Sequence, residues 1–400
     1  MRWRSTPVIA VLLWLPVVFG RSQQTGRIFG HVYRADTGTP LAGVTVSLAS
    51  PALSKTIVKQ SQTAQDGSYR LVGFPAGNDY SVSAFKAGFT PAVYGLDRSG
   101  TLMPLTIGQG EARDNIDLKV NPVASVTQMD DAALAPAYSE ERLYLRFGVG
   151  RFSTDGTLLA FTVGDPDPSQ VWLYDLSSRH LTPVTEQPPP TGGLAVLDMA
   201  WSGDTLYAET RDITNRVQYF QATVASTKAI SEIPAEAEAP LRHEALRLAF
   251  GSAGNDLFVV AAENQGHGDF TLRAKVTAGQ KKYVIANGGW ELDSFVFVPD
   301  RSLVLYPEWS PYMYGAIVTF DLNTRQSKRT YLPVRPETLL DARAEPQGFL
   351  VAYATYGPCE SGGETSQNQP NDAHLPSNVC FAEVPFKGSS RGALVGLRRN

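Results

Sequence analysis

Few residues in this chain are placed to catalyse a reaction. Residues 388–392 match the nucleophile-elbow pattern GxSxG, but no histidine follows them in the chain. Residues 83–86 match SxxK, yet they lie in an alternating run, where neighbouring side chains face opposite sides of a strand. His243 and Glu244 start a zinc-peptidase pattern that fails at Arg247, where the second histidine would stand. We therefore predict no catalytic residue, no metal site, no cofactor and no enzymatic activity.

A group of aromatic residues suggests that the protein binds a ligand or partner. Exposed aromatic rings stack on sugars or on a partner's side chains at little cost in conformational entropy. The same rings could equally pack between neighbouring sheets. The residues of this candidate binding patch are Tyr306, Glu308, Trp309, Tyr312 and Tyr314.

A second polar group lies earlier in the chain. Glu263, Asn264, His267 and Asp269 combine carboxylate, amide and imidazole groups within seven positions. They could form a binding site, with a cation as one ligand, or simply a solvated loop. We retain them as candidate binding residues and assign no metal to them.

Both groups belong to a region that repeats, over about residues 141–400. Each unit has an apolar start, a short turn and an apolar strand, with a third strand later and a weaker fourth in the first four units. Four short strands every 40 to 50 residues is typical of a propeller blade, because stacked blades bury both faces of each sheet. An ordinary large β-sandwich is the alternative. The units start at Phe152, Trp201, Phe250, Phe297 and Ala344, at intervals of 49, 49, 47 and 47.

The first unit, "FSTDGTLLAF" with "VWLYDLSSRHLTPVT", resembles blades of TolB-like and WD-repeat-like propellers. Five blades are visible, and a sixth would need "GALVGL" near the C-terminus. We expect "LYLRF" from Leu143 to supply the outer strand that closes the ring with the last blade. The loops between second and third strands are long and should emerge on one face, where a rigid scaffold would present binding residues.

The segment before it, about residues 26–120, reads as a β-sandwich. Residues 44–48 alternate with period two, as a half-buried strand does. Asp66 and Gly67 form a tight turn before the next strand. About seven short strands without a helical period favour a sandwich.

Two passages in this segment, "GRIFGHVYRADTGTPLAGVTVSL" and "TAQDGSYRLVGFPAGNDYSVSAFKAGF", resemble the carboxypeptidase-regulatory-like family. Asn78 and Asp79 are inserted where that family passes directly from Gly to Tyr. The resemblance implies a transthyretin-like, Ig-like accessory sandwich that is not itself the protease. This fold is grouped with carbohydrate-binding-like modules, so the resemblance allows glycan binding.

The remaining segments concern export and linkage. Residues 1–22 have the layout of a signal peptide, with Arg2 and Arg4 before a short apolar run, and an uncleaved membrane anchor is the alternative. Residues 121–140, rich in Ala, Pro, Asp and Ser, suggest a linker.

Cys359 and Cys380 bracket a polar segment that a disulfide would close in an oxidising compartment. Two free thiols are the alternative.

Taken together, these features predict an all-β protein that is secreted, periplasmic or on the cell surface. Its net charge of −4 and lack of a Lys/Arg run argue against a nucleic-acid partner, and no later segment could span a membrane. Our leading hypothesis is a non-enzymatic binding or scaffold protein that uses one propeller face to bind an envelope protein or glycan. The alternatives are carbohydrate binding through the sandwich, and a propeller-based hydrolase or lyase whose carboxylates or histidine converge at the central channel.

Overall fold

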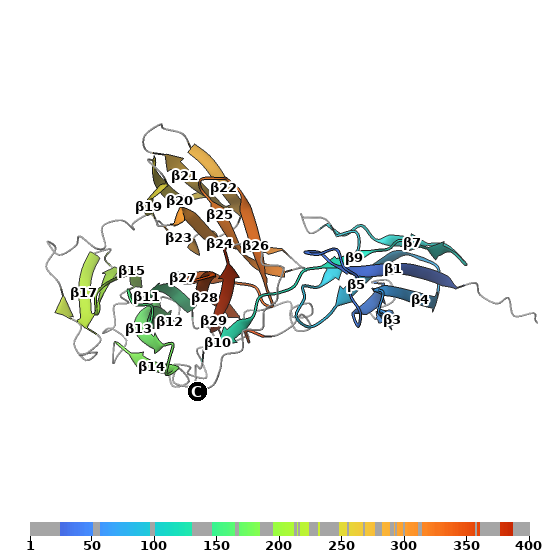
Figure 1. Cartoon of the computed structure of the whole chain (residues 1–400), viewed down its shortest axis with the longest axis horizontal. Helices are drawn as coiled ribbons and strands as arrows, with labels where there is room; N and C mark the ends of the chain where they lie inside the picture. Colours follow the sequence, from blue (N-terminus) through green and yellow to red (C-terminus); the bar gives the residue numbers. More distant parts are fainter. Residues whose placement is uncertain are drawn as a thin grey trace, which may run out of the picture.

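The fold is taken from a computed structural model of the whole chain. Figure 1 shows two β regions along the long axis of the molecule, a blue-to-teal region at one end and a green-to-red region at the other. The structure describes residues 25–50, 57–96, 101–129, 146–164, 168–184, 195–211, 214, 217–223, 231–232, 248–253, 256–266, 269–276, 282–288, 292, 294–298, 301–310, 314–356, 358–360 and 377–386.

Two sheets form the first region. The first has the order β4-β1-β8, with β9 also paired to β1, and the second has the order β3-β2-β5-β6, with β7 also paired to β5. Their strands are β1 Gly26–Arg34, β2 Thr45–Ala49, β3 Ile57–Gln62, β4 Ser68–Phe74, β5 Gly77–Phe85, β6 Ala92–Val93, β7 Leu105–Ile107, β8 Ala112–Arg113 and β9 Leu118–Val120.

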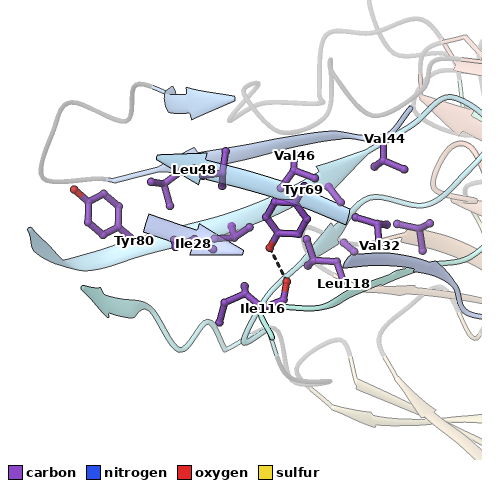
Figure 2. Packing of buried hydrophobic residues seen from close by; sticks show 14 of the residues in the cluster. Ile28, Val32, Val44, Val46, Leu48, Tyr69, Tyr80, Ile116 and Leu118 are labelled. Carbon is purple, nitrogen blue, oxygen red and sulfur yellow. Dashed lines mark hydrogen bonds between the residues drawn. The ribbon is translucent and has the colours of Figure 1, made fainter. Parts of the chain in front are cut away.

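The alternation of apolar residues explains how these two sheets pack. Ile28, Val46 and Leu48 are fully buried between the sheets, while their sequence neighbours face outward. Tyr69 lies in the same core and donates its hydroxyl to the backbone oxygen of Ile116 at 2.5 Å (Figure 2). Burial raises the pKa of the Tyr69 hydroxyl, so this group stays a hydrogen-bond donor. The predicted sandwich is confirmed.

Five four-stranded sheets form the second region as far as the structure describes it. Four of them follow the chain from strand to strand, and the fifth has the order β10-β29-β28-β27. The strands of the first two are β11 Arg146–Phe152, β12 Leu158–Gly164, β13 Pro168–Asp175, β14 His180–Pro183, β15 Ala195–Ser202, β16 Thr205–Arg211, β17 Val217–Thr223 and β18 Ser231–Glu232. The others are β19 Leu248–Ala253, β20 Asp256–Gly266, β21 Asp269–Val276, β22 Lys282–Gly288, β23 Val296–Val298, β24 Leu303–Ser310, β25 Tyr314–Asp321, β26 Ser327–Leu332, β27 Thr338–Glu345, β28 Gly348–Tyr356, β29 Ser377–Pro385 and β10 Val126–Gln128.

At four seams within the described residues, neighbouring sheets meet through their first strands and stack their faces. β11 contacts β15 and β27, and β23 contacts β19 and β27, which places these strands innermost. Apolar clusters join the first sheet to the second, the third to the fourth, the fourth to the fifth and the fifth to the first. Stacking of this kind buries both faces of a sheet, as in a propeller. Each predicted repeat corresponds to one sheet, while "GALVGL" lies outside the described residues.

The strand that completes the last sheet differs from our expectation. β10 pairs antiparallel with β29, so the outer strand comes from the segment predicted to be a linker rather than from "LYLRF". The described end of "LYLRF", Arg146 and Phe147, belongs instead to β11, the innermost strand of the first sheet. The sequence pattern could not identify this strand, because its pairing joins Val126 to the distant Ala382.

The chain between the two regions is bonded to both of them. The N–H of Val123 donates to the oxygen of Gly88 in the sandwich at 3.0 Å. The N–H of Ala124 donates to the oxygen of Tyr331 in β26 at 2.7 Å. β10 follows at once, so residues 121–128 connect the sandwich directly to two propeller sheets (Figure 1).

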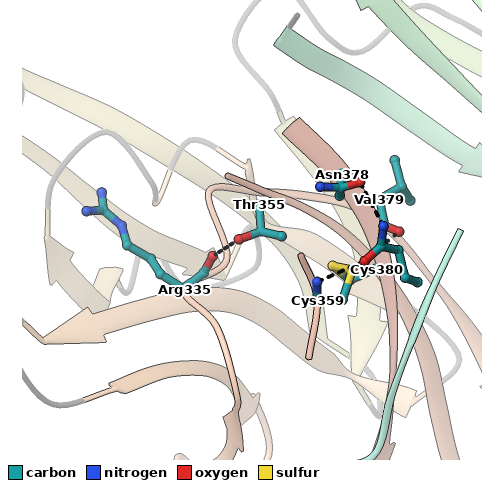
Figure 3. The surroundings of a disulfide bond; sticks show 7 residues. Arg335, Thr355, Cys359, Asn378, Val379 and Cys380 are labelled. Atoms are coloured by element: carbon teal, nitrogen blue, oxygen red, sulfur yellow. Dashed lines mark hydrogen bonds between the residues drawn. A yellow bond between two sulfur atoms is a disulfide. The ribbon is translucent and has the colours of Figure 1, made fainter. Parts of the chain in front are cut away.

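The predicted disulfide is also confirmed. Cys359 and Cys380 are bonded, with Cα atoms 5.8 Å apart, and both are fully buried (Figure 3). The bond attaches the chain after β28 to β29, the strand that β10 pairs with. Gln128 of β10 accepts a hydrogen bond from the N–H of Cys359 at 3.1 Å and donates to the side-chain oxygen of Asn378 at 3.0 Å. The disulfide and the added strand therefore form one connected structure.

Residues 1–22, predicted to be a signal peptide, lie outside the described part of the chain. Among the residues that are described, no helix has the length and apolar character needed to cross a membrane.

Candidate functional site

The residues of the predicted aromatic patch do not all lie on one exposed surface. Tyr306 is only 5% exposed and packs in the core between the third and fourth sheets, so it does not contribute an exposed ring. Burial, with a smaller contribution from Glu308, raises the pKa of Tyr306 to about 12, while Arg329 acts in the opposite direction. The prediction that Tyr306 belongs to an exposed binding patch was therefore wrong, because the strand register turns its side chain inward.

Glu308 lies two residues further along β24 and forms an ion pair. Both of its carboxylate oxygens accept hydrogen bonds from the guanidinium of Arg329 on β26, at 2.7 and 2.9 Å. Two-point contacts of this type fix side-chain orientation, but an exposed pair stabilises by less than about 1 kcal/mol.

The other predicted binding residues lie at hairpin ends. Trp309 pairs with Gly315 and Ser310 with Tyr314 in the β24–β25 hairpin. Similarly, Glu263 and Asn264 on β20 lie opposite Thr271 and Phe270 of β21, and Asp269 starts β21. The side chains of Trp309, Tyr314, Glu263, Asn264 and Asp269 fall outside the description, as do Tyr312 and His267 entirely.

A charged cluster that we did not predict lies on the innermost strands. It consists of Arg151 on β11, Asp198 on β15 and Asp341 on β27, from three consecutive sheets. Each of these strands carries a β-bulge just before the charged residue, between Phe147 and Gly150, between Val196 and Asp198, and between Leu339 and Asp341. A bulge changes the direction of the side chains that follow it.

Hydrogen bonds join this inner-strand cluster across the seams between sheets. Arg151 donates from Nη2 to Oδ1 of Asp198 at 2.7 Å. The backbone N–H of Phe152 donates to Oδ2 of Asp341 at 2.7 Å. The indole N–H of Trp201 donates to the backbone oxygen of Arg151 at 3.1 Å. β11 is thus attached to the sheet on either side of it.

The electrostatics of the cluster follow from its burial. Burial raises the pKa of Asp341, and the nearby positive charge of Arg151 offsets part of that effect. The nearby charge of Asp198 acts in the same direction as burial. Asp198 itself is 4% exposed, so its ion pair with Arg151 compensates a carboxylate removed from water.

Arg343, two residues beyond Asp341, extends these connections. It donates to the backbone oxygen of Gly156 in the β11–β12 turn and to Glu345. Its guanidinium also lies 5.8 Å from the centre of the Phe152 ring, within the range of a cation–π contact. These contacts connect the fifth sheet to the first sheet at Phe152 and at the β11–β12 turn.

Asp198 and Asp341 each link two neighbouring sheets through a hydrogen bond. Both carboxylates accept hydrogen bonds from neighbouring strands, which suits them to joining sheets. No group of three His, Cys, Asp or Glu side chains that could hold a metal occurs in the described part of the chain. In the SxxK string, Lys86 donates to the backbone oxygen of Ala42 at 2.6 Å, an ordinary structural contact.

A sequence signal for this cluster did exist. Asp198 and Asp341 each stand three residues before a repeat start, at Trp201 and Ala344. Ser294 occupies the same position before Phe297 and accepts a hydrogen bond from the N–H of Leu339 in the next sheet at 3.0 Å. Polar residues at one fixed offset in an apolar repeat indicate a shared inter-sheet role.

The first region has a clear family relationship. Residues 27–119 match the family model of the carboxypeptidase regulatory-like domain. This match covers the sandwich and agrees with the resemblance found in its sequence. No match was found among curated proteins.

Solved structures that resemble the chain do so weakly. TolB from Acinetobacter baumannii is 14% identical, with 74% of this chain and 65% of TolB covered and a TM-score of 0.25. A GH43B protein of the Bacteroides ovatus xyloglucan PUL is 11% identical, covering 60% and 52%, with a TM-score of 0.35. An oligogalacturonate lyase in complex with manganese is 10% identical, covering 91% and 98%, with a TM-score of 0.25. At such scores the propeller assignment depends on the strand pairing described above.

Proposed function

We propose that this protein is a non-enzymatic binding or scaffold protein that acts outside the cytoplasm. The observation that carries the proposal is the bonded connection between its two regions. Residues 121–128 bond in succession to the sandwich, to β26 and to β29. A connection without a free linker holds an accessory module at a fixed position relative to the propeller, which suits a protein that displays binding surfaces.

The chemistry of its cysteines supports this location. The Cys359–Cys380 disulfide is buried beside the strand that completes the last sheet. Disulfides persist in oxidising compartments and are rare in the cytosol. The signal-peptide pattern of residues 1–22 supports the same location.

The absence of enzymatic activity is part of the proposal. The inner-strand cluster supports it, because Asp198 and Asp341 are engaged with Arg151 and with the N–H of Phe152. A general base or nucleophile needs to reach a substrate, whereas these groups hold neighbouring sheets together. The converging carboxylates that we named as a mark of a hydrolase or lyase are therefore better explained as structural.

We place the binding surface of the propeller at the hairpin ends between second and third strands. The β24–β25 hairpin carries Trp309, Tyr312 and Tyr314, and the β20–β21 hairpin carries Glu263, Asn264, His267 and Asp269. An envelope protein is the partner that rings and polar groups on neighbouring hairpins would suit.

The test is site-specific photocrosslinking of the full chain in its native envelope. A benzophenone amino acid replaces Trp309 near the end of β24 in one protein, and Arg325 in the β25–β26 connection in the control. We expect a discrete adduct from position 309 only, and direct binding once that partner is purified. Equal crosslinking from both positions, or turnover of glycan or peptide substrates by the purified protein, would contradict the proposal.

A further inference from the structure

The outward side of β1 carries three aromatic side chains in line. Phe29, His31 and Tyr33 alternate with buried residues of the sandwich core and are each partly exposed. Alternate positions on a strand are about 7 Å apart, so the three rings span roughly 13 Å. The rings of His31 and Tyr33 stack with centres 5.8 Å apart.

Polar side chains border this line on both neighbouring strands. On β4, Arg70 lies opposite Phe29 and Ser68 lies opposite His31. On β9, Lys119 is the register partner of Tyr33. We call these residues, together with Arg27 and Asp117, the β1 outer face.

A break between β8 and β9 shapes the middle of this face. Asn115 lies there with a φ of 62°, in the left-handed region that is uncommon for residues other than glycine. On the core side of β1, the oxygen of Ile116 passes where a Cβ on Gly30 would stand, at 2.1 Å, so only glycine fits at position 30. The break brings Oδ1 of Asp117 to 2.8 Å from the backbone N–H of His31 and 3.7 Å from its Nδ1.

Positive charge is concentrated at one end of the face. Arg27 and Arg70 flank Phe29, and both are exposed. Within the part of the chain that the structure describes, neither guanidinium has an ion pair or a hydrogen bond to another side chain. By contrast, Arg113 on the adjacent β8 is paired with Glu111 at 2.7 Å. Among the described residues, two guanidiniums beside the partly exposed Phe29 therefore remain available for a ligand with negative charge.

We propose that the β1 outer face binds an acidic oligosaccharide, one whose sugar rings carry carboxylates. The aromatic line offers flat apolar surfaces for the faces of successive sugar rings. Arg27 and Arg70 supply the donors that match a carboxylate, and Ser68, Asp117 and Lys119 supply partners for hydroxyl groups. A sheet face with rings and polar groups in neighbouring rows suits an extended glycan better than a peptide, which needs pockets for its side chains.

This inference assigns a ligand to the sandwich and does not depend on the partner of the propeller. The test measures retardation of the purified full chain in native gels containing alginate, whose sugars are all uronic acids. Propylene glycol alginate is the matched polymer with its carboxylates esterified. We expect retardation by alginate that weakens with added salt, and about tenfold weaker binding to the ester.

Substitutions on the β1 outer face test whether alginate binds there. Arg70→Gln and Tyr33→Ala should each weaken alginate binding about tenfold, without a change in far-UV circular dichroism. Arg179→Gln removes an exposed positive charge from the propeller and should have no effect. Because Tyr33→Ala could alter folding, Arg70→Gln provides the decisive comparison.

Three results would overturn the inference: no retardation by alginate, equal binding of its ester, or equal losses in Arg70→Gln and Arg179→Gln. Binding of polyglutamate as tight as that of alginate would also overturn it, because charge alone would then explain the interaction. None of these results bears on the crosslinking experiment at position 309.

Discussion

Oδ2 of Asp341 accepts a hydrogen bond from the backbone N–H of Phe152 at 2.7 Å, across 189 positions of sequence. The bond joins β27 to β11 at the seam between the last sheet and the first. We expect Asp341→Ala to lower the free energy of unfolding by about 1–3 kcal/mol, because it leaves the N–H of Phe152 without its acceptor. Asp341→Asn keeps an acceptor and should cost less. Urea denaturation measures both, with the exposed turn variant Asp204→Asn as control; equal stability of Asp341→Ala and wild type would contradict the assignment.

Because of the Asp341 carboxyl, the free energy of unfolding should decrease as pH rises. Burial raises the pKa of Asp341 above the 3.8 of a free aspartate, so the folded chain binds this proton more tightly than the unfolded chain. Its contribution is greatest below the unfolded pKa and falls as pH rises through the folded pKa. Wild type should therefore lose stability relative to Asp341→Asn over that range, as measured by urea titrations at a series of pH values. A difference that does not vary with pH would rule this out.

Asp175 should show the opposite behaviour. It accepts hydrogen bonds from the hydroxyl and N–H of Ser177 and from the N–H of Ser178 in the β13–β14 turn. These bonds lower its pKa to about 2, with the Ser177 hydroxyl contributing most. Its contribution to stability is therefore present above 3.8 and lost as pH falls through about 2. An NMR titration of the carboxyl should have its midpoint near that value in wild type and rise in Ser177→Ala; an unshifted titration in both would disprove it.

The disulfide should make a large contribution to stability. Cys359 and Cys380 are separated by 21 positions, and closing a loop of that length stabilises by about 3 kcal/mol on the loop-entropy model. The double variant Cys359→Ala, Cys380→Ala should unfold at correspondingly lower urea concentration. The urea midpoints of wild type and variant should become equal only when wild type is unfolded under reducing conditions. Equal midpoints without reductant would refute the prediction.

Gln128 should contribute to attachment of β10. Its side chain bonds to the N–H of Cys359 and to Asn378, which is 5% exposed. Gln128→Ala should cost about 1 kcal/mol, whereas the adjacent exposed variant Thr127→Ala should be close to neutral. Hydrogen exchange of the amides of β10 and β29 should accelerate in Gln128→Ala alone. If both variants behave alike, the side-chain bonds do not hold the strand.

The sandwich and the repeats could be predicted from local patterns alone. Alternation at residues 44–48 predicts a strand because one face must be buried, and intervals of 47 to 49 residues predict equal sheets for the same reason. The disulfide was predictable because the chain holds only two cysteines. In each case the signal lies within one segment or repeats at a fixed distance.

Tertiary structure decided the features that depend on register and on distant partners. Tyr306 turns inward because pairing with Val318 fixes which way its strand faces, and a shift of one residue would reverse it. β10 joins the last sheet because Val126 meets Ala382, a pairing that no local pattern encodes. Asp198 and Asp341 reach opposite sides of β11 because bulges redirect their strands and the stacking of sheets brings them together. The sequence by itself determined which faces are apolar, and only the packing of those faces determined which polar groups meet.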